Sequence, residues 1–146
     1  TMDVCGTYPD RIAAGMALGV GCSLKDVSGL GKLPFWIIHG TADRAVPVKQ
    51  SKVVVDKLKR DGNDSRLIYD WGQGANHGMP DRVFYMKKTY QWLFSHTLND
   101  SDRPVNRDID ISMGDVRNAY DGVNRNAPKP ELIDGPSVIK NEGNEY

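Results

Sequence analysis

The chain has 146 residues, which is long enough for one domain with a hydrophobic core. Basic and acidic side chains balance at 19 each, so the composition gives no electrostatic reason to expect nucleic-acid binding. No apolar run approaches the roughly 20 residues that cross a bilayer. Two cysteines and three histidines are too few for the usual structural zinc site, and we expect neither a metal ion nor a cofactor.

The first 40 residues predict a short helix followed by two strands. Residues 1–8 fit the end of a helix, which Pro9 stops because proline cannot extend it. The apolar, small-residue run 12–20 predicts a strand that is buried on both faces, and the Gly- and Ser-rich stretch 21–32 predicts a loop. Residues 35–38 are β-branched and aromatic, and they predict a second buried strand.

The next 55 residues alternate between helix and strand signals. Pro47 stands where its missing N–H costs nothing, at the start of a helix predicted over 48–60. A third strand is expected at 67–69 and a Gly-rich loop at 71–80. Asp81 is placed to cap one further helix, which has a wide apolar face.

Residues 97–146 differ in composition from residues 1–96. They hold four of the eight prolines, many Asn and Asp residues, and more acidic than basic side chains. We interpret them as a C-terminal extension that packs partly on the preceding domain. Within it, the sequence predicts a weak strand at 109–112 and a short helix at 112–120.

Strands that alternate with helices predict an α/β fold with a parallel sheet covered on both faces. Functional groups in such sheets collect in the loops at the carboxyl ends of the strands. Asp43 and His77 both occupy loops of that kind, separated by one helix and one strand. A carboxylate that binds an imidazole fixes its tautomer and stabilises its protonated form. The sequence therefore predicts Asp43 and His77 as the acid and base of one catalytic site.

The other polar candidates have simpler interpretations. His39 is expected to be structural, holding its loop by a side-chain hydrogen bond, and His96 is expected to close the last helix of the domain, where a positive charge suits the helix dipole. Ser23 lacks a glycine on its far side and is not expected to be a nucleophile. Cys5 and Cys22 are expected to be small buried hydrophobic residues.

Trp71 and Met79 flank the loop that contains His77. Two roles stay open for them: they line a substrate pocket, or they hold the loop against the core.

Three segments carry a resemblance to a known family: TYPDRIAAGMALGVG, LPFWIIHGTADRAVPVKQSKVVVDKLK and YDWGQGANHG. With these, residues 7–96 resemble the C-terminal half of an α/β-hydrolase, near the esterase, polyhydroxybutyrate-depolymerase and dienelactone-hydrolase-like branches. The resemblance implies that Asp43 and His77 belong to a Ser-His-Asp triad that cleaves a small-molecule carboxylic ester. It also implies that residues 1–96 are the C-terminal half of such a domain.

Such enzymes carry their serine in a Gly-x-Ser-x-Gly turn between a strand and a helix, and the 146 residues contain no such motif. We therefore expect a fragment of a serine hydrolase whose nucleophile lies outside this chain, and no esterase activity from the chain alone. Two alternatives stay open. The chain is a non-catalytic binding module of the same ancestry, or it is one half of a hydrolase whose second chain or segment supplies the nucleophile.

Overall fold

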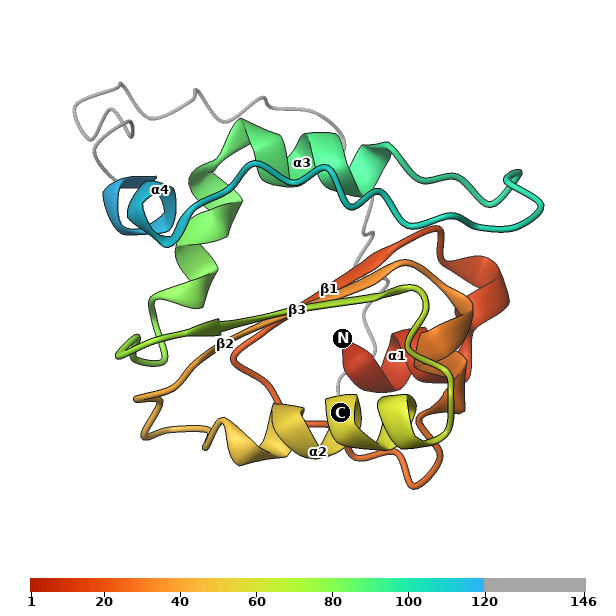
Figure 1. Ribbon diagram of the computed structural model, residues 1–146, viewed down its shortest axis with the longest axis horizontal. Helices are drawn as coiled ribbons and strands as arrows, with labels where there is room; N and C mark the ends of the chain where they lie inside the picture. Colours follow the sequence, from red (N-terminus) through yellow and green to blue (C-terminus); the bar gives the residue numbers. More distant parts are fainter. Residues whose placement is uncertain (120–146) are drawn as a thin grey trace, which may run out of the picture.

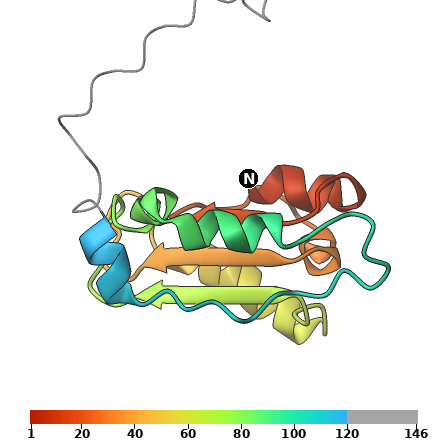
Figure 2. The ribbon, with the colours of Figure 1, turned by 90° about the horizontal axis from the view of Figure 1, so that it is seen from above.

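The computed structural model describes residues 1–119, and its centre is a three-stranded parallel sheet. Strands β1 (Gly15–Leu18), β2 (Phe35–Gly40) and β3 (Leu67–Gly72) lie side by side in this order. Both pairings are parallel, so the carboxyl ends of the strands share one edge of the sheet (Figure 2). The predicted α/β fold with a parallel sheet is confirmed.

Helices cover both faces of this sheet (Figure 1). One face carries α1 (Met2–Thr7) and α2 (Lys49–Arg60). The other carries α3 (Lys87–Phe94), α4 (Met113–Asn118) and the 3-10 helix η3 (Pro80–Tyr85). Two further 3-10 helices precede β1 and β2, namely η1 (Pro9–Arg11) and η2 (Ser28–Lys32).

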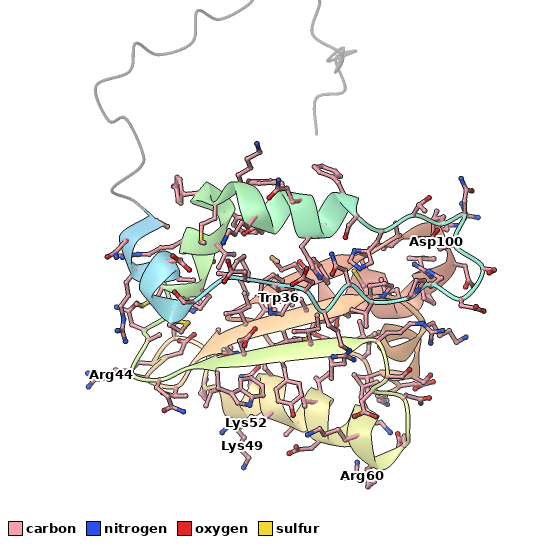
Figure 3. All side chains as sticks on the ribbon, turned by 45° about the horizontal axis from the view of Figure 1, so that its top comes forward. Trp36, Arg44, Lys49, Lys52, Arg60 and Asp100 are labelled. Carbon is pink, nitrogen blue, oxygen red and sulfur yellow. The ribbon has the colours of Figure 1, made fainter. Side chains whose placement is uncertain are left out.

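Strands β1 and β2 are buried along their whole length because successive side chains point to opposite faces and both faces are covered, whereas β3 also carries the exposed Asp70. The first core cluster lies between the sheet and the helices α1 and α2; its buried members include Met2, Ala17, Phe35, Ile37, Val54, Val55, Leu58 and Leu67. The second core cluster lies on the other face, with Met16, Leu18, Trp36, Ile38, Val83, Trp92 and Val116. Trp36 meets Trp92 edge-to-face at 5.3 Å between ring centroids, beneath α3 in Figure 3. Each fully buried Val, Leu, Ile, Phe or Met side chain stabilises the fold by about 1.5–3 kcal/mol.

The strands differ from their predicted bounds at identifiable places. β1 is shorter than 12–20 because the carbonyls of Ile12 and Ala13 accept hydrogen bonds from Arg103, and because Gly19 turns into the left-handed region at φ +56°. β2 and β3 extend beyond 35–38 and 67–69 because they pair with each other up to Gly40 and Gly72.

The helix predicted over 48–60 is present as α2, but the single helix predicted after Asp81 is wrong. The chain forms η3, then an extended residue at Met86 (φ −110°, ψ 126°), and only then α3. Asp81 lies inside η3 and caps no helix with its side chain. Val83, in η3, is fully buried in the second core cluster.

Residues 97–119 cross the second face of the sheet and end in α4. The predicted strand at 109–112 is wrong, since Ile109 and Ile111 pack against the second core cluster instead of pairing with a strand. The predicted helix at 112–120 is present as α4, and Ser112 caps it in a reciprocal hydrogen-bonded pair with Asp115. Residues 120–146, including the last residue of that predicted helix, lie outside the described part. The division of the chain at residues 96 and 97 stays a prediction.

Candidate active site

The loops that follow β2 and β3 lie at the carboxyl edge of the sheet (Figure 2). Asp43 lies in the first of these loops and His77 in the second. Nδ1 of His77 is 2.8 Å from Oδ2 of Asp43, which is hydrogen-bond distance. The structure thus brings together the two residues that the sequence singled out, although they are 34 positions apart.

Backbone hydrogen bonds fasten the two loops to each other. The N–H of Thr41 donates to Gly72 O at 2.9 Å, and the N–H of Ala42 donates to Ala75 O at 3.0 Å. Gly40 makes this approach possible, because a Cβ at that position would stand 2.2 Å from Ala75 O. The carboxylate and the imidazole are therefore held on a joined pair of loops rather than on two independent ones.

The Asp43 carboxylate is buried and surrounded by donors. Its side chain is 0% exposed. Oδ1 accepts the N–H groups of Ala45 at 2.9 Å and Val46 at 2.8 Å, and Oδ2 faces both His77 and the Nε2 atom of His39, the latter at 3.2 Å. Burial by itself would raise the pKa of Asp43, but the hydrogen bonds from His77, Val46 and Ala45 outweigh it and hold the pKa below its ordinary value. The carboxylate is therefore ionised at neutral pH.

His77 stands half in solvent, with its side chain 50% exposed. Because Asp43 is ionised and only accepts, Nδ1 of His77 carries the hydrogen of their bond and Nε2 is the basic nitrogen of the neutral ring. The hydrogen bond to Asp43 and the negative charge of that carboxylate raise the pKa of His77. An open hollow of about 550 Å³ adjoins the imidazole; its lining residues are Ala42, Arg44, Ala45, Asn76, His77 and Gly78. Arg44 extends into solvent at this end of the molecule (Figure 3).

Gly19 is a third contributor that the sequence analysis did not single out. It directly follows β1, and a Cβ on it would lie 3.4 Å from both Asp43 Oδ2 and His77 Nδ1. Its φ of +56° also favours glycine. The sequence does contain a signal for this close approach of Gly19 to the Asp43–His77 pair. The signal is a glycine at the end of a predicted strand, next to two strands that are followed by polar residues.

The remaining candidates have structural roles. The predicted hydrogen bonding of His39 is confirmed, with Nδ1 2.7 Å from Ser51 Oγ and Nε2 2.8 Å from Val46 O. Trp71 packs against the first core cluster and Met79 against the second, and neither lines the hollow beside His77. These two side chains therefore hold the loop in place.

His96 does not fit the expectation of a charged residue at a helix end. α3 ends at Phe94, and His96 is buried, with Nε2 accepting the N–H of Asn106 at 3.0 Å. Burial lowers the pKa of His96, so the ring is neutral at neutral pH.

The two cysteines and Ser23 lie outside the Asp43–His77 pair. Cys5 is buried in the first core cluster, as expected. The expectation is wrong for Cys22, which is half-buried and whose thiol donates to Asp3 Oδ1 at 3.2 Å. Ser23 is exposed, and its backbone N–H donates to the same oxygen. Within residues 1–119, no group of three or more His, Cys, Asp or Glu side chains is arranged to hold a metal ion, and no helix is long and apolar enough to cross a membrane.

An ionised buried carboxylate bound to a half-exposed imidazole is an arrangement that takes up a proton at Nε2 and stabilises the resulting positive charge. Comparisons with known proteins bear on which reaction this serves. Residues 24–100 match the model of the prolyl oligopeptidase family. The fold is similar to that of a protein described as a thermostable esterase, with a TM-score of 0.56, 24% sequence identity and 64% of this chain covered. The chain spans about a quarter of that esterase chain, 26% of its length. Curated protein sequences returned no match.

Proposed function

Because the chain belongs to the prolyl oligopeptidase family and has part of an α/β-hydrolase fold, we propose that it forms the acid–base part of a serine hydrolase. In this proposal Asp43 is the acid that orients the base, and His77 is the base. The observation that carries the proposal is the 2.8 Å contact between His77 Nδ1 and the buried Asp43 carboxylate, which leaves Nε2 as the proton acceptor.

The proposed reaction is acyl transfer in two stages. His77 Nε2 takes the proton of a serine hydroxyl while the serine oxygen bonds to the carbonyl carbon of the substrate. The same proton then passes to the leaving alkoxide as the bond between carbon and the alcohol oxygen breaks. Water repeats the sequence on the acyl-enzyme, again losing its proton to Nε2. Asp43 keeps its negative charge throughout and stabilises the imidazolium.

The proposed nucleophile is a serine outside these 146 residues, supplied by another segment of a longer protein or by a second chain. The printed sequence holds no Gly-x-Ser-x-Gly turn to provide it. The preferred substrate is a small-molecule carboxylic ester. A peptide is the second candidate, favoured by the peptidase family whose model the chain matches.

The test uses the longest natural form of the protein that contains residues 1–146, assayed with short p-nitrophenyl esters and with peptide p-nitroanilides. We expect His77→Ala and Asp43→Asn to lower kcat/KM by about 10⁴-fold on whichever substrate is cleaved. The matched control is Asp61→Asn, which changes an exposed carboxylate whose partner is Lys57 at 2.9 Å and leaves the rate unchanged. Equal rates for the parent and the His77→Ala variant would reject the proposed roles.

A fluorophosphonate probe separates the alternatives. The proposal expects labelling of a serine outside residues 1–146 and none within them. A protein that folds cooperatively, binds a ligand in the hollow beside His77 and takes up no probe would instead be a binding module.

A further inference from the structure

Asn106 fastens the segment that follows α3 to the end of that helix. Its backbone N–H donates to Nε2 of His96 at 3.0 Å, and its backbone O accepts the indole N–H of Trp92 at 2.7 Å. Its side-chain NH₂ group lies 3.3 Å from Ser95 Oγ. The chain around Asn106 has no regular secondary structure, so α3 and the residues directly after it supply the partners for these polar groups.

The bond between Asn106 and His96 requires a neutral imidazole. Nε2 accepts the N–H of Asn106, so Nε2 carries no hydrogen and the hydrogen of the neutral ring is on Nδ1. Nδ1 is buried and has no hydrogen-bond partner within residues 1–119. His96 is only 8% exposed, and its ring packs edge-to-face on Trp92 at 4.7 Å between ring centroids. In a protonated ring the hydrogen on Nε2 would face the N–H of Asn106, donor would meet donor, and the bond would be lost.

The charged groups around His96 do not offset its burial. The Asp100 carboxylate and two backbone carbonyls of α3 near the ring favour the protonated form, but burial outweighs them and lowers the pKa of His96 from its ordinary value of 6.5. Lys88 and Asp110, further along the same two segments, pair with each other at 2.8 Å. A proton on His96 is therefore more stable where the segment has opened and water reaches the ring than where the segment is closed.

We propose that His96 and Asn106 form an acid-released latch: residues 104–108 close onto the end of α3 while the His96 ring is neutral, and uptake of a proton from solvent at Nε2 releases them. The fixed end of the latch is Arg103, whose guanidinium stays charged and donates to backbone carbonyls that precede β1. Opening uncovers the side of the second core cluster against which Val105 packs. The latch needs no serine and no substrate, so it does not depend on the proposed function.

The experiment follows hydrogen exchange of the Asn106 amide by NMR in the 146-residue chain between pH 5 and 8. After correction for the intrinsic exchange rate, the protection of this amide measures how rarely the latch opens. We expect constant protection above pH 6.5, because both the open and the closed forms are then neutral. Below pH 6.5 the open form binds the proton more tightly, so protection should fall by up to about tenfold for each pH unit until the closed form is protonated as well.

His96→Gln is the matched variant, because the amide oxygen of Gln accepts the N–H of Asn106 and the side chain does not titrate in this range. Protection of Asn106 in this variant should not change with pH. His39 and His77 remain in it, so any pH dependence that they cause would still be seen. His96→Phe has no acceptor, and protection of Asn106 should be low at every pH.

Two results would overturn the proposal: the same pH dependence of Asn106 protection in the parent chain and in His96→Gln, or a pKa of His96 at or above 6.5 in the folded parent chain. Should His96→Gln fail to fold, the ring ¹⁵N shifts of His96 in the unmodified chain decide the matter. Above pH 7 they must show a bare Nε2 and a protonated Nδ1, and a hydrogen on Nε2 refutes the latch. These measurements involve no catalysis, so their outcome is separate from that of the hydrolase assay.

Discussion

Replacing Asp43 by Asn is the change that bears most directly on the site. The carboxylate accepts three hydrogen bonds: those from the N–H groups of Ala45 and Val46 on one oxygen, and that from the ring of His77 on the other. An Asn side chain has one acceptor oxygen and a two-donor NH₂ group. With its oxygen on the backbone donors, the NH₂ group faces the Nδ1–H of His77, and donor meets donor. His77 avoids this repulsion by changing tautomer, with its hydrogen on Nε2 instead of Nδ1.

The cost follows from these contacts. A hydrogen bond to a charged group contributes about 1.5–3 kcal/mol, and Asp43→Asn removes the charge from the bond to His77 and from the bonds to Ala45 and Val46. His77 recovers part of the loss by changing tautomer, and His39 keeps its bond to Val46 O. We therefore expect the free energy of unfolding to fall by about 2–4 kcal/mol. In the proposed hydrolase the moved hydrogen leaves no base at Nε2, which is the reason for the expected loss of about 10⁴-fold in kcat/KM.

Two measurements on the 146-residue chain check this reasoning. Urea unfolding gives the change in free energy, with Asp61→Asn as the control on an exposed carboxylate. The ring ¹⁵N shifts of His77 report its tautomer. The reasoning is refuted if His77 in Asp43→Asn still carries its hydrogen on Nδ1, or if the two variants are equally stable.

Three further predictions concern pH, backbone strain and the last helix. Because the pKa of Asp43 is lowered in the folded chain, its contribution to stability is present above the ordinary pKa of 3.8 and is lost as the pH falls through the folded-state pKa. Urea midpoints measured between pH 2 and 5 should show this loss in the parent chain and less of it in Asp43→Asn. Gly19→Ala should lower the free energy of unfolding by about 1–2 kcal/mol because of its φ of +56°, and it should also shift the NMR titration of His77. The control is Gly74→Ala, at φ +69° with no atom within 4 Å, which should show the backbone strain alone. Val116→Ala should lower the free energy of unfolding by about 1–3 kcal/mol, because the side chain is buried at 3% exposure. It should also speed amide hydrogen exchange in residues 80–85, which α4 contacts. Unchanged exchange there would show that α4 does not support η3.

Much of the fold was predictable because its signals are local. The aromatic and β-branched run of β2 predicted a strand buried on both faces, and Pro47 predicted the start of α2, whose first residue is Lys49. The positions of Asp43 and His77 after consecutive parallel strands predicted that they meet at one edge, since parallel strands end on the same side. The 2.8 Å contact between them is the observed form of that expectation.

Other features depend on residues that are distant in sequence. β1 is short because Arg103 binds the carbonyls that precede it, and the expected helix is divided into η3 and α3 by the extended residue Met86. The sequence alone determined the alternation of strands and helices and the shared edge of Asp43 and His77, because periodicity and chain direction are properties of neighbouring residues. Only the tertiary structure decided that Gly19 lies against this pair and that the buried His39 bonds Ser51 and Val46, because these contacts arise from how three strands and α2 pack together.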